Sequence, residues 1–160
     1  MIDTIDYGKL LQTLTRSFAL GANSIHGPSH WKRVEEIGVL LAPNCGADLT
    51  VVKLFALFHD SCRMNDGEDP DHGKLGANLA ETMRGTHFTL DDTRFESLKF
   101  ACIWHTSGKV SKDPTIGACW DADRLDLPRC GIWPDPKFLS TVMAKNPKTI
   151  SWAMSISRRA

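Results

Sequence analysis

Six acidic or imidazole side chains stand at positions where they can act together as metal ligands: His30, His59, Asp60, His72, His105 and Asp123. Neutral imidazoles and carboxylates bind first-row divalent ions such as iron, manganese, cobalt, nickel or zinc. The five cysteines are scattered without a CxxC pair, which disfavours a structural zinc site or a disulfide framework and is typical of reduced thiols. These residue types predict a site for one or two divalent ions with open coordination positions.

The spacing of these residues places them on apolar helical faces. His30 precedes Ile37 and Leu41 by seven and eleven positions, so it lies on a stripe that is expected to be buried. A single buried histidine is more often a hydrogen-bonded core residue than a ligand. Asp123 is harder to explain in this way, because a buried and unpaired carboxylate costs too much free energy for a small domain. A shared metal site accounts for all of these groups together.

Helices joined by short turns are expected to position the site, and no stretch of period-two alternation predicts a sheet. The expected helices cover about 7–22, 29–41, 51–60, 72–85, 92–108, 114–127, 136–145 and 151–160. Pro43 and Gly46 are expected to stop the second helix. The fold class is therefore all-α: a compact helical bundle that forms a single domain over residues 1–160.

Composition limits the possible partners. The chain has 160 residues, with 19 Lys and Arg against 19 Asp and Glu, which suits one domain of zero net charge. Zero net charge disfavours nucleic-acid binding, because a protein that binds through the phosphates usually carries a surplus of basic residues. No apolar run reaches the ~20 residues that span a bilayer, and the first residues lack the pattern of a signal peptide. We expect a soluble cytoplasmic protein; its oligomeric state is left open.

The ordered motifs resemble those of the HD-domain superfamily of metal-dependent phosphohydrolases. The resemblance rests on the segment 26–34 with its His-Gly-Pro-Ser-His start, the apolar run into His59-Asp60, and Asp121-Ala122-Asp123-Arg124-Leu125. It covers a core of about 29–127, with N-terminal and C-terminal helices packed on it. The resemblance implies a helical bundle of the HD type. It makes His30, His59, Asp60 and Asp123 ligands of a first metal ion.

Two further histidines are similar to additions found in some branches of that superfamily. His72 and His105 would hold a second ion, with Asp60 bridging the two. Two dications among two carboxylates leave a local charge of about +2, which attracts phosphate. The sequence His-Thr-Ser-Gly-Lys at 105–109 resembles the branch that hydrolyses diadenosine tetraphosphate symmetrically. The short loop after Asp60, Arg63 where relatives often carry lysine, and the stretch 129–136 depart from that branch, so its substrate is not carried over.

The resemblance implies a hydrolase that attacks phosphorus with metal-bound hydroxide. The expected substrate is a small phosphorylated metabolite, with a nucleotide as first candidate, and the enzyme is a phosphomonoesterase or a phosphodiesterase or pyrophosphohydrolase. Asp60 would act at the metals, and Arg63 and Lys109 would bind the phosphate. A diiron oxygenase with the same His/Asp ligands is the alternative, and a non-catalytic nucleotide sensor is a weaker one.

Several other residues are expected to lie outside the ligand set or to have a different role. His26 and His87 lack an inward helical phase and are left outside the site. Asp121 is expected to be a surface carboxylate or to support the ligands. Trp104 and Trp133 are the tryptophans that could stack on a nucleobase.

Overall fold

The computed structural model describes residues 2–159, which form eight α-helices and two short 3-10 helices. Among the described residues no strand forms, and strand-like pairing is limited to isolated bridges of Phe88 with Ile5 and Arg84. The predicted all-α class is confirmed. The elements are α1 (Tyr7–Ser17), α2 (Pro28–Cys45), α3 (Leu49–Phe58), α4 (His72–Met83), α5 (Asp92–Trp104), α6 (Pro114–Leu125), η1 (Leu127–Cys130), η2 (Pro136–Phe138), α7 (Val142–Lys145) and α8 (Pro147–Ser157).

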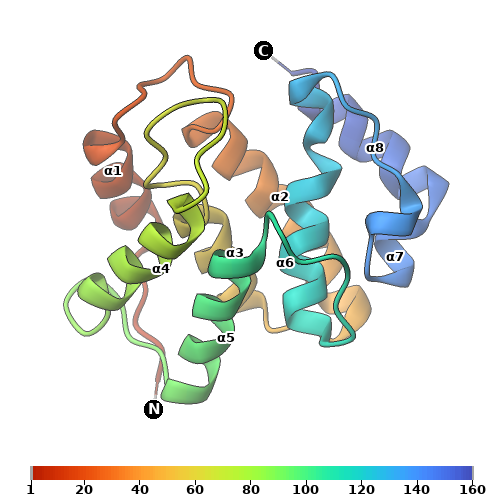
Figure 1. The fold of residues 1–160 in the computed structure, drawn as a ribbon. Helices are drawn as coiled ribbons and strands as arrows, with labels where there is room; N and C mark the ends of the chain where they lie inside the picture. Colours follow the sequence, from red (N-terminus) through yellow and green to blue (C-terminus); the bar gives the residue numbers. More distant parts are fainter. Residues whose placement is uncertain (1, 160) are drawn as a thin grey trace.

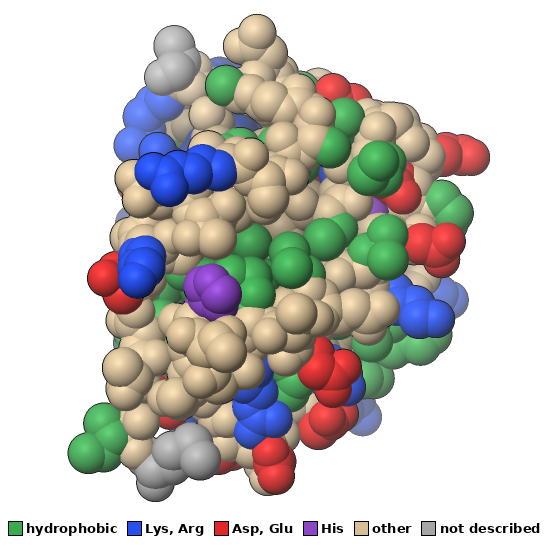
Figure 2. Space-filling model, turned by 90° about the vertical axis from the view of Figure 1, so that its left-hand side faces the viewer, with side chains coloured by type: hydrophobic (Ala, Val, Ile, Leu, Met, Phe, Trp, Pro, Cys, Tyr) green, Lys and Arg blue, Asp and Glu red, His purple; other side chains and the backbone are tan. Residues whose placement is uncertain are grey.

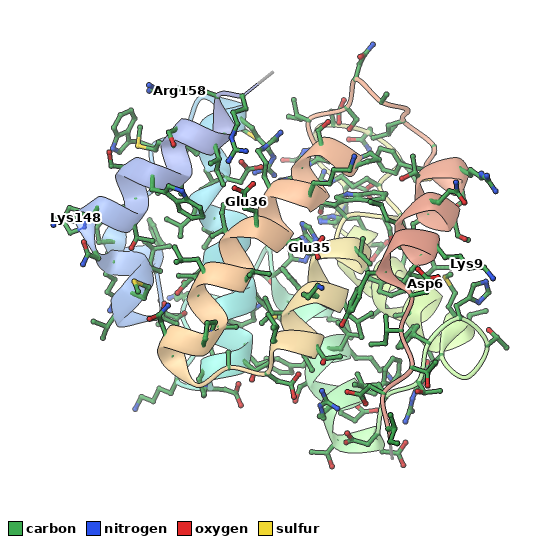
Figure 3. The ribbon with its side chains drawn as sticks, turned by 180° about the vertical axis from the view of Figure 1, so that it is seen from behind. Asp6, Lys9, Glu35, Glu36, Lys148 and Arg158 are labelled. Carbon is green, nitrogen blue, oxygen red and sulfur yellow. The ribbon has the colours of Figure 1, made fainter. Side chains whose placement is uncertain are left out.

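The helix α2 runs through the middle of the molecule. It packs against α3 on one side and α6 on the other, while α4 and α5 form a second closely packed pair (Figure 1). Seen from behind, α2 lies between α1 and α8 and carries Glu35 and Glu36 on its outer face (Figure 3). These carboxylates pair with Lys53 and Arg159, at 3.4 and 2.8 Å. The apolar side of α2 is thereby left for the core.

The helix α3 is the most apolar element, and it is almost completely enclosed. Its buried side chains are Val51, Val52, Leu54, Phe55, Ala56, Leu57 and Phe58. A helix that is apolar on nearly every side is stable only when other elements surround it. Since α3 contacts α2, α4, α5 and α6, the residues that follow its last turn, His59 and Asp60, emerge in the interior of the protein.

Two glycines allow α4 to approach the ends of α3 and α5 closely. A Cβ atom on Gly76 would lie less than 3.0 Å from the carbonyl oxygen of Phe58. A Cβ on Gly73 would meet the carbonyl oxygen of Cys102 at a similarly impossible distance. Backbone atoms cannot yield as a flexible side chain can, so only glycine permits this contact. The N-terminus of α4 is therefore held against the segments that carry His59 and His105.

Several expected boundaries differ from the structure: α1 ends at Ser17 and not near residue 22, α5 ends at Trp104 and not near 108, and α8 begins at Pro147 and not near 151. Two further differences have a local cause. The helix α2 continues through Pro43 to Cys45 and ends at Gly46, whose φ of 74° is left-handed. A proline in the last turn removes one backbone hydrogen bond, whereas the glycine provides the conformation that terminates the helix. The helix expected over 136–145 is divided into η2 and α7. Asp135 caps the first piece and Thr141 caps the second, so two local N-terminal signals replace one helix.

The surface agrees with a chain of zero net charge. On the face that carries α1 and α4, acidic and basic side chains alternate around a band of hydrophobic ones (Figure 2). None of the described helices is both long enough and apolar enough to cross a membrane.

Asp48 joins the start of α3 to α5, and its replacement by asparagine tests this link. Its carboxylate caps Val51 and accepts two hydrogen bonds from Arg94, at 2.7 and 3.0 Å. Burial opposes the charge, but Arg94 and the capping amides lower the pKa of Asp48 below its ordinary 3.8. We expect Asp48→Asn to reduce the free energy of unfolding by about 1 kcal/mol at pH 7, because solvent screens a partly exposed pair.

A lowered pKa means that the stabilisation is present above pH 3.8 and disappears as the pH falls through the lowered value. Denaturant unfolding at pH 7 and pH 2 measures this. An equal deficit at both pH values would show that the charge of Asp48 does not contribute.

Candidate metal centre

The ends of several helices deliver the six predicted ligand side chains to one buried location. Their positions are His30 in the first turn of α2, His59 and Asp60 directly after α3, His72 at the start of α4, His105 directly after α5, and Asp123 in the last turn of α6. Five of these side chains are buried in the interior, and that of Asp123 is 16% exposed. A helix end suits a metal ligand because the helix is packed in the core and therefore fixes the orientation of the side chain at its end.

Four of the side chains form a first cluster. The Nε2 atom of His30 lies 3.0 Å from Nε2 of His59, 3.1 Å from Oδ1 of Asp123 and 3.5 Å from Oδ2 of Asp60. His59 Nε2 lies 3.5 and 3.6 Å from the same two carboxylate oxygens. These four atoms surround a space that a single ion can fill.

The other oxygen of Asp60 faces a second cluster. Oδ1 lies 3.2 Å from Nε2 of His72 and 3.3 Å from Nε2 of His105, and these two nitrogens are 2.9 Å apart. Each cluster is compact enough to hold an ion, and the two share Asp60. The carboxylate of Asp60 thus stands between two sets of imidazoles, which is the geometry of a bridging ligand.

Hydrogen bonds on the far side of each ring determine which nitrogen carries the proton. The Nδ1 atoms face acceptors: Asp126 Oδ2 for His30 (2.6 Å), Phe55 O for His59 (3.0 Å), Cys102 O for His105 (2.6 Å) and Asp69 O for His72. Because Nδ1 keeps its proton and donates it to these acceptors in a hydrogen bond, the neutral rings present lone pairs at Nε2. Two lone pairs about 3 Å apart repel unless a cation lies between them.

The electrostatics of the carboxylates point the same way. Burial alone would raise the pKa of Asp60; without an ion, positive charge on His59 and hydrogen bonds from the other surrounding histidines lower it well below the ordinary value. Burial also opposes ionisation of Asp123, and His30 and His59 likewise lower its pKa. Oδ1 of Asp60 is buried without a hydrogen-bond partner in the described residues. An anionic and unsatisfied carboxylate oxygen is the group that a metal ion would satisfy, so the donor set fits one or two divalent ions.

Asp126 supports the first cluster from behind, a role that sequence reasoning missed. It is fully buried and accepts hydrogen bonds from His30 Nδ1, Arg33 Nε (2.8 Å) and Ser157 Oγ. Burial would raise its pKa, but His30 and Arg33 lower it. A carboxylate that binds the outer nitrogen of a ligand histidine orients the ring and raises its basicity. The available signal was its position three residues after Asp123.

Asp121 does something different from either expectation. It is completely buried, so the surface interpretation is wrong. Its two oxygens accept the backbone N–H groups of Ser140 (2.7 Å) and Thr141 (2.8 Å). Asp121 therefore fixes the segment before α7 to α6 and does not contact the ligand histidines.

His26 was wrongly left outside the site. Its Nδ1 atom lies 3.0 Å from Oδ2 of Asp60, and its ring is buried beside the first cluster. The helical phase argument failed because His26 lies in the turn before α2, where no helical face is defined. His87 is exposed and does not line the cavity of the metal clusters, as expected.

A cavity of about 250 Å³ opens onto the ligands, with three arginines in its wall. Arg63 and Arg129 are nearly buried, and no acceptor among the described residues binds Nε of Arg63, which lies 3.6 Å from Asp60 Oδ1. Arg129 approaches Asp123 Oδ1 to 3.9 Å. All three arginines also donate to backbone carbonyl groups: Arg63 to Gly67, Arg129 to Ile25 and Asp126, and Arg124 to Gly108, Lys109 and Phe138.

Lys109 lies elsewhere. Its side chain is exposed, and the residue does not line this cavity. The backbone oxygen of Lys109 accepts a hydrogen bond from Arg124, which does line it. A role of Lys109 in phosphate binding stays a prediction. Arg129 has the better position, and the sequence analysis had not selected it.

A solved structure supports the fold. No family model matches the chain, and no curated protein sequence matches it. The crystal structure of a predicted HD superfamily hydrolase from an uncultured Thermotogales bacterium is similar to it, with a TM-score of 0.67 and 24% identity. The match covers 92% of this chain and 84% of that one. The chain therefore has the fold of this HD superfamily hydrolase, and its two buried His/Asp clusters could each hold a metal ion.

Proposed function

We propose that the protein is a metal-dependent phosphohydrolase that acts on a small phosphorylated metabolite. The observation that carries the proposal is the position of Asp60 between two clusters of imidazole Nε2 atoms, beside the nearly buried guanidinium groups of Arg63 and Arg129. The side chains that could bind two divalent ions thus lie next to the positively charged guanidinium groups of two arginines. This combination is suited to an anionic substrate whose reacting atom needs charge stabilisation.

The residues of the chain would divide the work. Divalent ions held by the clusters would supply a Lewis acid that activates water and polarises the phosphoryl group. Asp60 and Asp123 hold the negative charge that balances the ions. Arg63 lines the cavity, and its guanidinium group would donate to a phosphoryl oxygen. Arg129 would contact the same group from the opposite wall.

The arginines also favour the hydrolase over a diiron oxygenase. The ligand set suits both classes, because two irons can use the same histidines and carboxylates. Molecular oxygen is neutral and gains nothing from two buried guanidinium groups, whereas a phosphate ester gains a charge-assisted hydrogen bond from each. The cleavage type, phosphomonoester against phosphodiester or pyrophosphate, is part of the test.

The test combines metal analysis with an activity screen. The purified protein is analysed for metals, stripped with a chelator, reloaded with manganese, cobalt or iron, and assayed for phosphate release from phosphomonoesters, phosphodiesters and pyrophosphates. We expect release that depends on added metal. Oxygen consumption together with a two-iron mixed-valence spectrum, and no phosphate release, would establish the oxygenase instead. Stoichiometric metal binding without either reaction would contradict the enzymatic proposal.

A further inference from the structure

A second cavity adjoins the cavity of the metal centre. Its volume is about 370 Å³, and two residues, Arg124 and Leu127, line both cavities. All the remaining lining residues come from the segment that links α6 to α7. Figure 1 shows the course of this segment beside α6. The wall consists of Ile132, Trp133, Pro134, Asp135, Phe138 and Leu139. The two cavities are therefore neighbours on either side of Arg124 and Leu127.

The wall of this second cavity exposes an unusual amount of apolar surface. Ile132 is 53% exposed, Trp133 66% and Phe138 51%. Three large apolar side chains within seven residues, all open to solvent around one hollow, resemble the lining of a ligand pocket. Two of the three are aromatic, and aromatic rings bind other planar rings by stacking.

The polar groups of the wall argue against a second phosphate. The N–H groups of Arg124 are directed to backbone carbonyl groups, including that of Phe138 at 2.7 Å. The other charged group of this lining is the carboxylate of Asp135. An anionic group would meet an occupied guanidinium and a negative charge here, whereas a neutral ring with N–H groups would meet apolar faces and an acceptor.

Size supports the same assignment. The cavity at the metal clusters, about 250 Å³, lies below the range of ~300–1,000 Å³ usual for small-molecule sites. The neighbouring cavity brings the combined site into the usual range.

We propose that this second cavity is a subsite for a planar aromatic ring carried by the phosphorylated substrate, with Trp133 and Phe138 as its specificity-determining residues. The proposal rests on the proposed function for the position of the phosphate. Trp133 also borders another apolar cavity, formed with Pro147 and Met154, but Phe138 does not. Phe138 therefore reports on the cavity that lies beside the metal-centre cavity.

The experiment compares two phosphomonoesters that differ by a ring. Adenosine monophosphate and ribose 5-phosphate present the same phosphate and sugar, with and without a nucleobase. We expect kcat/KM of the metal-loaded wild type to be about tenfold higher for adenosine monophosphate, since stacking of a base on an aromatic side chain has this effect. Trp133→Ala and Phe138→Ala should each remove most of the advantage through KM, and leave ribose 5-phosphate unchanged. Val142→Ala, which removes an 88% exposed apolar side chain outside this wall, is the matched control.

A binding measurement separates failure of the subsite from failure of the proposed function. Adenosine monophosphate should quench the tryptophan fluorescence of the metal-free wild type, and this quenching should be absent in Trp133→Phe. If no phosphate ester is cleaved but Trp133-dependent quenching occurs, the subsite stands and the hydrolase proposal fails. If both phosphomonoesters are cleaved equally and the variants change neither, the subsite is wrong. Absence of both cleavage and quenching also overturns it.

Discussion

Replacing Asp60 by asparagine is expected to remove the bound metal and to reduce phosphate release by more than about 100-fold. The two oxygens of Asp60 face different clusters, Oδ2 toward His30 and His59 and Oδ1 toward His72 and His105. Asparagine keeps one neutral oxygen and presents an NH₂ group to the other cluster. Both ions therefore lose an anionic ligand in a single substitution.

Metal content per chain after dialysis and phosphate release are the two measurements, and circular dichroism verifies folding. Asp92→Asn is the matched control, because it makes the same chemical change on a side chain that is 94% exposed. Unchanged phosphate release by Asp60→Asn would eliminate the metal-dependent mechanism. Retention of one ion out of two would limit the role of Asp60 to one cluster.

Gly76→Ala is expected to destabilise the protein by ~1–3 kcal/mol or more, although alanine is the better helix former. The added Cβ would collide with the carbonyl oxygen of Phe58, the residue that precedes His59. The helix α4 must then move away from α3, and His72 at its first turn moves with it. We expect a lower denaturation midpoint and weaker binding of the second ion.

Gly8→Ala is the control for this substitution. Gly8 also lies in a helix, but the nearest atom to its added Cβ is Asp6 Oδ1 at 3.6 Å, an ordinary contact. This variant should be as stable as the wild type or more stable. Equal denaturation midpoints for Gly76→Ala and the wild type would show that the close contact of α4 and α3 is not required.

The sequence predicted the helices and the meeting of the ligands because both depend on local periodicity. Apolar residues at helical spacing define a buried face, and a histidine or aspartate in phase with that face must also point inward. His30 and Asp123 are of this kind, and the structure places their side-chain atoms 3.1 Å apart. Their role as ligands stays a prediction until metal is measured.

Residues outside helical phase could not be placed from the sequence. His26 lies in a turn, and Arg129 lies in the short helix η1, so their directions depend on tertiary packing. Lys109 was selected from a motif, but the position of its side chain depends on how the loop after α5 folds. That loop is held by Arg124, whose contacts with Gly108 and Phe138 join segments far apart in the sequence.

Asp121 shows a further limit of periodicity. It is out of phase with the buried stripe of α6, which suggested an exposed or supporting carboxylate. The segment 140–141 covers that side of α6 and offers two backbone N–H groups to it. Burial by a later part of the chain cannot be read from the helix that it covers.

The hydrogen bond from Ser157 to Asp126 gives α8 an influence on a ring that lies more than a hundred positions earlier in the chain. Ser157 and Arg33 donate to Oδ1 of Asp126, while His30 faces Oδ2, so each donor withdraws negative charge from the carboxylate that polarises His30. When α8 is in place, His30 is a slightly weaker electron-pair donor; when α8 is displaced, His30 becomes a stronger one. If His30 holds a metal ion, the last helix of the described chain would thus influence how strongly it binds that ion.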